Sequence, residues 1–183
     1  AGTTTALDQV LMTSSVGLIN GSGLVTGNTV ALTAAIGIGN ATGIELSASN
    51  ISADTTSGDL EIDNVLGTSV NVTSLTTGSG SIDFDQSGGG SLVTGILSAT
   101  NTIDVTNSAG DVSLAGTVAS SDLVVTSSGA VTDGADGDLA ISGSAQLTGG
   151  SIELGNDAGN TTNFGSLTFN SAGSVNTVED SAL

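Results

Sequence analysis

The chain has 183 residues, of which 18 are acidic and none is Lys, Arg or His, so its formal charge at pH 7 is −18. This charge excludes nucleic acid as an electrostatic partner, because phosphate binding depends on Lys and Arg, and no apolar run is long enough for membrane insertion. Without His or Cys there is no Ser-His-Asp or Cys-His nucleophile, and any bound metal would be an oxygen-liganded Ca²⁺ or Mg²⁺.

The apolar residues make up 37% of the chain and are rich in Val, Ile and Leu, while proline is absent. Gly, Ser, Thr, Asn and Asp fill the spaces between them. This alternation is typical of short strands joined by tight turns. No segment has apolar residues at helical spacing, so we expect an all-β fold.

Triplets with apolar first and third residues recur along the chain. In order they are "VAL" at 30–32, "IEL" at 44–46, "LEI" at 60–62, "IDF" at 82–84, "IDV" at 103–105, "LVV" at 123–125, "LAI" at 139–141, "IEL" at 152–154 and "LTF" at 167–169. The four central triplets follow one another at steps of 22, 21 and 20 residues. Such a regular step indicates a repeat architecture.

Two further series of apolar positions lie between these triplets. The second series is "VNV" at 70–72, "LVT" at 92–94, "VSL" at 112–114 and Val131, and a third, weaker series is Leu75, Ile96 and Val118. Three short strands in a period of about 20–22 residues predict a parallel β-helix (β-solenoid) of about eight turns, because each turn must stack on the next to bury its apolar face.

This fold places the first residues of the central triplets in one interior column, Leu60, Ile82, Ile103 and Leu123. Their third residues, Ile62, Phe84, Val105 and Val125, form the column beside it. The alternative is an antiparallel β-sandwich, which also has short strands every 8–12 residues or so. The near-constant register favours the solenoid, because hairpins have no reason to keep it.

Several stretches resemble a known family of repeats. The runs "SADTTSGDLEIDNV", "TSLTTGSGSIDFDQSGGGSL" and "ATNTIDVTNSAGDVSLAG" are similar to the degenerate repeats of filamentous-haemagglutinin-like giant surface proteins of bacteria. The resemblance covers about residues 25–178 and rests on composition and period. It implies a right-handed parallel β-helix that is exported to the cell surface as an adhesin or a surface fibre.

The middle residues of the triplets face solvent in this fold, because side chains alternate along a strand. Glu61, Asp83 and Asp104 should therefore form an exposed ladder, with Asp63 and Asp85 beside it. Three interpretations remain open: a solvated face, a Ca²⁺ site at the ladder, or an acid pair for polysaccharide hydrolysis. The chain has no Trp, Tyr or basic residue to hold a sugar, so we do not expect an enzyme.

A second acidic group is "DGADGD", with Asp133, Asp136 and Asp138. Its spacing resembles the front half of a calcium loop, D-x-[DN]-x-[DN]-G. The carboxylates fall at positions 1, 4 and 6, however, and no Glu closes the loop. A polar corner loop explains the motif equally well, and Ca²⁺ is the only cofactor that the sequence suggests.

Neither "AGTTTALDQVLMTSSV" nor "SVNTVEDSAL" resembles a solenoid cap. We therefore expect residues 1–183 to form a single solenoid domain that is a segment of a longer chain or a subunit that stacks end to end. The expected function is structural, in an extracellular filament or a giant cell-surface adhesin. The alternatives are a solenoid face that binds surface carbohydrate or ice, and an Asp-dependent polysaccharide hydrolase.

Overall fold

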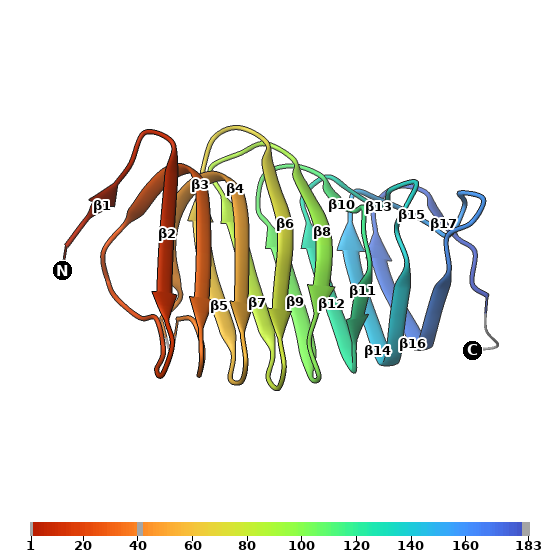
Figure 1. The fold of residues 1–183 in the computed structure, drawn as a ribbon. Coiled ribbons are helices and arrows are strands. Elements are labelled where there is room, and N and C mark those ends of the chain that lie inside the picture. Colours follow the sequence, from red (N-terminus) through yellow and green to blue (C-terminus); the bar gives the residue numbers. More distant parts are fainter. Residues whose placement is uncertain (1, 40–41, 181–183) are drawn as a thin grey trace.

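The computed structural model describes residues 2–39 and 42–180, and it confirms the predicted parallel β-solenoid of about eight turns. The coils stack side by side into a rod, with β1 and β17 at opposite ends (Figure 1). Every strand pairing among the described residues is parallel. This register excludes the antiparallel β-sandwich.

The strands lie on three faces of the rod. The first face holds β1 (Thr4–Thr5), the starts of β3 (Val25–Ala34) and β4 (Ile44–Thr55), β5 (Leu60–Val65), β7 (Ile82–Ser87), β9 (Thr102–Asn107), β12 (Asp122–Ser127), and the ends of β14 (Leu139–Gly149) and β16 (Thr162–Ser171). Each coil adds one strand to this face.

The other two faces complete each coil. The second face holds the start of β2 (Gln9–Ser14), the middle parts of β3 and β4, the starts of β6 (Val70–Thr77) and β8 (Leu92–Ser98), β10 (Val112–Leu114), β13 (Ala130–Asp133), β15 (Ser151–Leu154) and β17 (Val175–Thr177). The third face holds the ends of β2, β3, β4, β6 and β8, then β11 (Val118–Ser120), and the starts of β14 and β16.

The interior column predicted for the first face is confirmed. Leu60, Ile82, Ile103 and Leu123 pair in register from coil to coil, and each is at most 1% exposed. The column beside it runs through Phe84 and ends at Phe169, which is 51% exposed in the last coil. The apolar lining is therefore covered along the rod and uncovered at this axial end.

The third predicted series is wrong at Ile96. Leu75 pairs with Leu97, which in turn pairs with Val118, whereas Ile96 is 50% exposed. The reason is the corner between the second and third faces, where two consecutive residues of β6 and of β8 lie outside the core. This corner shifts the inside–outside alternation by one residue, so a count that ignores it selects the neighbour of the buried side chain.

Polar side chains form a second interior ladder at the end of the first face. Asn64, Gln86, Asn107 and Ser127 are stacked in register and are between 0% and 5% exposed. Asn64 Nδ2 donates to Gln86 Oε1 at 2.6 Å, and Asn107 Nδ2 donates to the Gly90 and Asp111 carbonyl oxygens at 3.1 and 2.9 Å. These amides bond to backbone groups of the corner, where the strand ladder ends.

The corner after β7 depends on glycine. Gly88, Gly89 and Gly90 have φ values of 96°, 108° and 85°, a region that favours glycine. A Cβ on Gly90 would lie 2.4 Å from the carbonyl carbon of Thr68 in the preceding coil. Close stacking of the coils and the sharp turn thus both require the absence of a side chain here.

Within the described residues, no helix is long and apolar enough to cross a membrane.

Candidate functional site

The parallel register brings six carboxylates together on the outer side of the first face. Glu61 pairs with Asp83 and Asp83 with Asp104, which is the ladder that the sequence predicted. A second column lies beside it, because Glu45 pairs with Asp63 and Asp63 with Asp85. Neighbours within a column are about one strand spacing, roughly 4.8 Å, apart. We call this set the acidic face: Glu45, Glu61, Asp63, Asp83, Asp85 and Asp104.

The middle of the acidic face disfavours ionisation. Burial among neighbouring side chains, which is the largest cause, and next the charges of Asp85, Asp104, Glu61 and Asp63 together raise the pKa of Asp83 to about 6. Burial is also the largest cause of the raised pKa of Asp63 and of Asp104, and the charge of Asp85 contributes to both. With no Lys, Arg or His in the chain, only protons or external cations can relieve this repulsion.

The acidic columns change character along the rod. Above Asp85 the same outer column continues as Thr106, Thr126 and Thr148. The neighbouring column passes from Asp104 to Val124. These two outer columns are thus acidic toward β4 and uncharged toward β14, and only one of them is a continuous threonine row. The acidic half is the part suited to cations.

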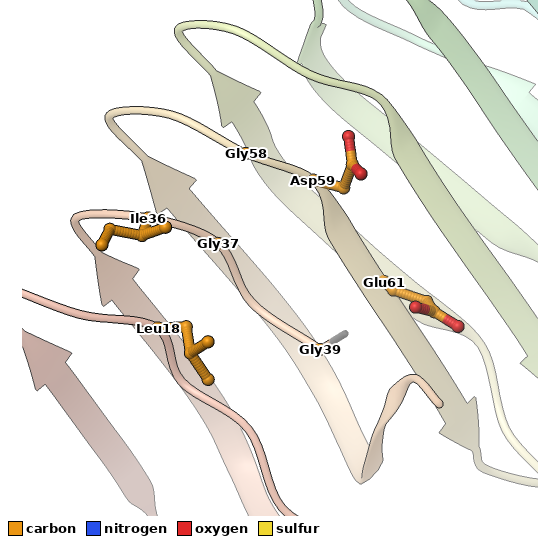
Figure 2. A pocket seen from close by; sticks show the side chains of 7 residues that line it. All are labelled: Leu18, Ile36, Gly37, Gly39, Gly58, Asp59 and Glu61. Carbon is orange, nitrogen blue, oxygen red and sulfur yellow. The ribbon is translucent and has the colours of Figure 1, made fainter. Parts of the chain in front are cut away.

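A hollow of about 250 Å³ adjoins the acidic face at Glu61 (Figure 2). Leu18 and Ile36, which are 44% and 53% exposed, form one wall, and Asp59 lies on the opposite side. The hollow arises because glycines line its floor: a Cβ on Gly58, for example, would lie 1.8 Å from the Ile36 carbonyl oxygen. Apolar walls with carboxylates at the rim suit the stem and head of a basic side chain.

The three carboxylates of "DGADGD" point to different places. Asp133 ends β13 and is only 7% exposed, because it occupies the inner column position above Leu114. Asp136 is exposed in the following turn. Asp138 accepts hydrogen bonds from the Thr161 backbone N–H and hydroxyl at 2.8 and 2.9 Å, and these bonds lower its pKa. The structure therefore does not gather these three side chains around one point.

Among the residues that the structure describes, no group of three or more Asp, Glu, His or Cys side chains is arranged to hold a metal ion. Calcium binding at Glu61, Asp83 and Asp104, or at Asp133, Asp136 and Asp138, stays a prediction. In either place an ion would need oxygen ligands beyond the three carboxylates, since Ca²⁺ takes about six to eight.

Sequence reasoning missed two features of these sites. Glu45 joins the acidic face although it precedes Asp63 by only 18 residues, a step shorter than the repeat that guided the prediction. Asp133 lies in the core wall, and the signal for this was available: it follows Val131 at the spacing that places Leu114 after Val112.

Comparisons of the chain with models of protein families, with curated proteins and with solved structures give no match.

Proposed function

We propose that the chain is a structural segment of an extracellular filament or of a giant cell-surface adhesin, similar in role to filamentous-haemagglutinin-like repeat regions. One observation carries this proposal: the parallel ladder runs from β1 to β17, so that every coil is hydrogen-bonded to the next. A solenoid of this kind gains length by repetition and is stiff because its coils share one continuous core. Its work is to span distance.

The surface chemistry supports the same role. The charge of −18, with no basic side chain to offset it, keeps neighbouring rods apart in solution. The chain also lacks every Lys and Arg at which a trypsin-type protease would cleave. Both properties suit a rod that stands outside a cell.

The axial ends provide the contacts through which such a rod extends. β2 pairs only with β3, and β17 only with β15, so each leaves one strand edge without a neighbour among the described residues. Unpaired edges accept further strands. In this proposal the edges are covered by further coils, which belong either to a parent chain or to a second copy stacked end to end.

Electron microscopy of the native protein tests the proposal. Straight filaments of uniform width, or thin stalks that antibodies label on unopened cells, are the expected result. Compact particles, or labelling only after the cells are opened, would contradict it. A solution of the 183-residue chain should scatter X-rays as a rod on the order of 40 Å long, since about eight turns stack at the strand spacing.

A further inference from the structure

The corner between β13 and β14 encloses a carboxylate oxygen that lacks a partner. Asp133 Oδ2 accepts hydrogen bonds from the Gly155 backbone N–H at 2.7 Å and from Asn160 Nδ2 at 3.3 Å. Asp133 Oδ1 is buried, yet no group in the described part of the chain bonds to it. An ionised carboxylate taken out of water in this way requires a compensating positive charge or donor.

A second such oxygen lies one coil further along the rod. The side chain of Thr162 is fully buried, and its Oγ1 has no hydrogen-bond partner among the described residues. Both residues border Gly155: Asp133 bonds to its N–H, and a Cβ on Gly155 would lie 2.0 Å from the Val178 carbonyl oxygen and 3.1 Å from Thr162 Oγ1. Gly155 has a φ of 70° and carries no side chain, so the two unpaired oxygens flank the same backbone site.

The groups around this corner add negative charge and no positive charge. Asp138 accepts hydrogen bonds from Thr161, and Asp180 Oδ2 accepts one from the Thr162 backbone N–H at 2.8 Å. The chain has no Lys, Arg or His that could neutralise Asp133 from elsewhere in the fold. The corner thus combines an enclosed negative charge, a free hydroxyl oxygen and an acidic surrounding.

We propose that Asp133 Oδ1 and Thr162 Oγ1 bind a calcium ion at this corner. Ca²⁺ prefers oxygen ligands and accepts irregular geometry, and backbone carbonyl oxygens and water can complete its shell. The site differs from the one that the sequence suggested: it keeps Asp133 and adds Thr162, while Asp136 stays in solvent and Asp138 stays bonded to Thr161. Because Asp133 and Thr162 belong to different coils, the ion fastens one coil to the next.

Calcium binding to the whole chain tests this site. After treatment with a chelator, the chain is dialysed against radioactive Ca²⁺ and its thermal unfolding is followed at rising Ca²⁺ concentration. We expect Tm to rise by about 5 °C or more at a concentration near a hundred times the Kd, because the ion binds only the folded state. Asp133→Asn should lose one bound ion per chain and most of this rise. Thr162→Val, which removes only the hydroxyl, should weaken binding about tenfold.

Two matched variants locate the ion. Asp136→Asn removes a carboxylate from the same turn, and Asp83→Asn removes one from the acidic face; both should keep the ion that Asp133→Asn loses. Circular dichroism checks that each variant is folded, and Thr162→Val decides the question if Asp133→Asn does not fold. The proposal is overturned if Asp133→Asn and Thr162→Val bind Ca²⁺ like the unaltered chain. It is also overturned if Ca²⁺ leaves the Tm of the unaltered chain unchanged.

Discussion

Asp83 lies one coil from Glu61 in the same outer column, so their carboxylates face solvent side by side at the spacing of two parallel strands. Like charges in this position destabilise a sheet. Partial burial is the largest cause of the rise in the pKa of Asp83 to about 6, and repulsion by neighbouring carboxylates, Glu61 among them, adds to it. Asp83 and its neighbours therefore link the stability of the rod to pH.

We expect the rod to be more stable at pH 5 than at pH 7.5. The folded state holds a proton on Asp83 up to about pH 6, whereas the unfolded chain releases it near pH 4, so stability falls as pH rises through this interval. Asp122 and Asp138 act in the opposite sense, because hydrogen bonds lower their pKa and their contribution is lost below about pH 4. Tm measured from pH 3 to 8, with a chelator and constant ionic strength, should peak near pH 4–5.

Asp83→Asn is the control for this pH profile. At pH 7.5 the variant should be more stable than the unaltered chain by about 1 kcal/mol, a modest value because solvent screens the exposed charges. Its Tm should change less between pH 5 and 7.5. Equal profiles for the two chains would show that the carboxylates of the acidic face titrate independently.

Two adjacent residues of β9 should respond in opposite ways to substitution. Ile103 is fully buried, so Ile103→Asp places an unpaired charge in the core and should cost about 4 kcal/mol or more. Asp104→Ser removes one repelling carboxylate from the acidic face and should be neutral or stabilising by up to about 1 kcal/mol. Denaturant unfolding of both variants measures the difference. Equal destabilisation would contradict the inside–outside assignment of this strand.

Asn107 holds the corner that follows β9. Asn107→Ala leaves the Gly90 carbonyl oxygen without its donor, leaves the Asp111 carbonyl oxygen with the Leu92 N–H alone, and opens a small cavity, which should cost about 2–4 kcal/mol. Asn71→Ala, on an exposed outer position of β6, is the matched control and should change stability by less than about 0.5 kcal/mol. Hydrogen exchange should show the loss first at residues 108–111. Protection that stays unchanged there would mean that the amide does not hold the corner.

Gly90 should not tolerate a side chain. Gly90→Ala forces a φ of 85° on an L residue and a contact of 2.4 Å with Thr68, so we expect a loss of at least about 2 kcal/mol. Gly21→Ala is the control, because a Cβ there meets nothing within 4 Å. Thermal unfolding should separate the two variants clearly. A normal Tm for Gly90→Ala would show that the coils can move apart at this corner.

The columns of the first face could be predicted because Leu60, Ile82, Ile103 and Leu123 follow one another at a nearly constant number of residues along the sequence. Constant spacing fixes which side chains stack, and strand alternation then fixes which face solvent. The prediction was wrong at Ile96 because two consecutive outward residues at the corner shift the alternation of inward and outward side chains. No regular sequence pattern marks such a corner. Corner geometry thus depends on contacts between coils that spacing alone does not encode.

The interior ladder of polar side chains could have been predicted from the sequence but was not. Asn64, Gln86, Asn107 and Ser127 each stand two residues after the second buried apolar position of their triplet, where alternation places the next inward side chain. In a sequence, polar residues at that position are easily interpreted as the first residues of a loop. They are buried because the turning backbone presents carbonyl oxygens and N–H groups that apolar side chains cannot satisfy.

The bonds between coils run parallel to the axis of the rod, so tension applied at its two ends crosses every coil boundary in series. Each boundary carries the full force, and rupture begins at the weakest one. Adding coils therefore increases the length of the molecule without raising the force that it withstands, because that force is set by the weakest contact between two neighbouring coils.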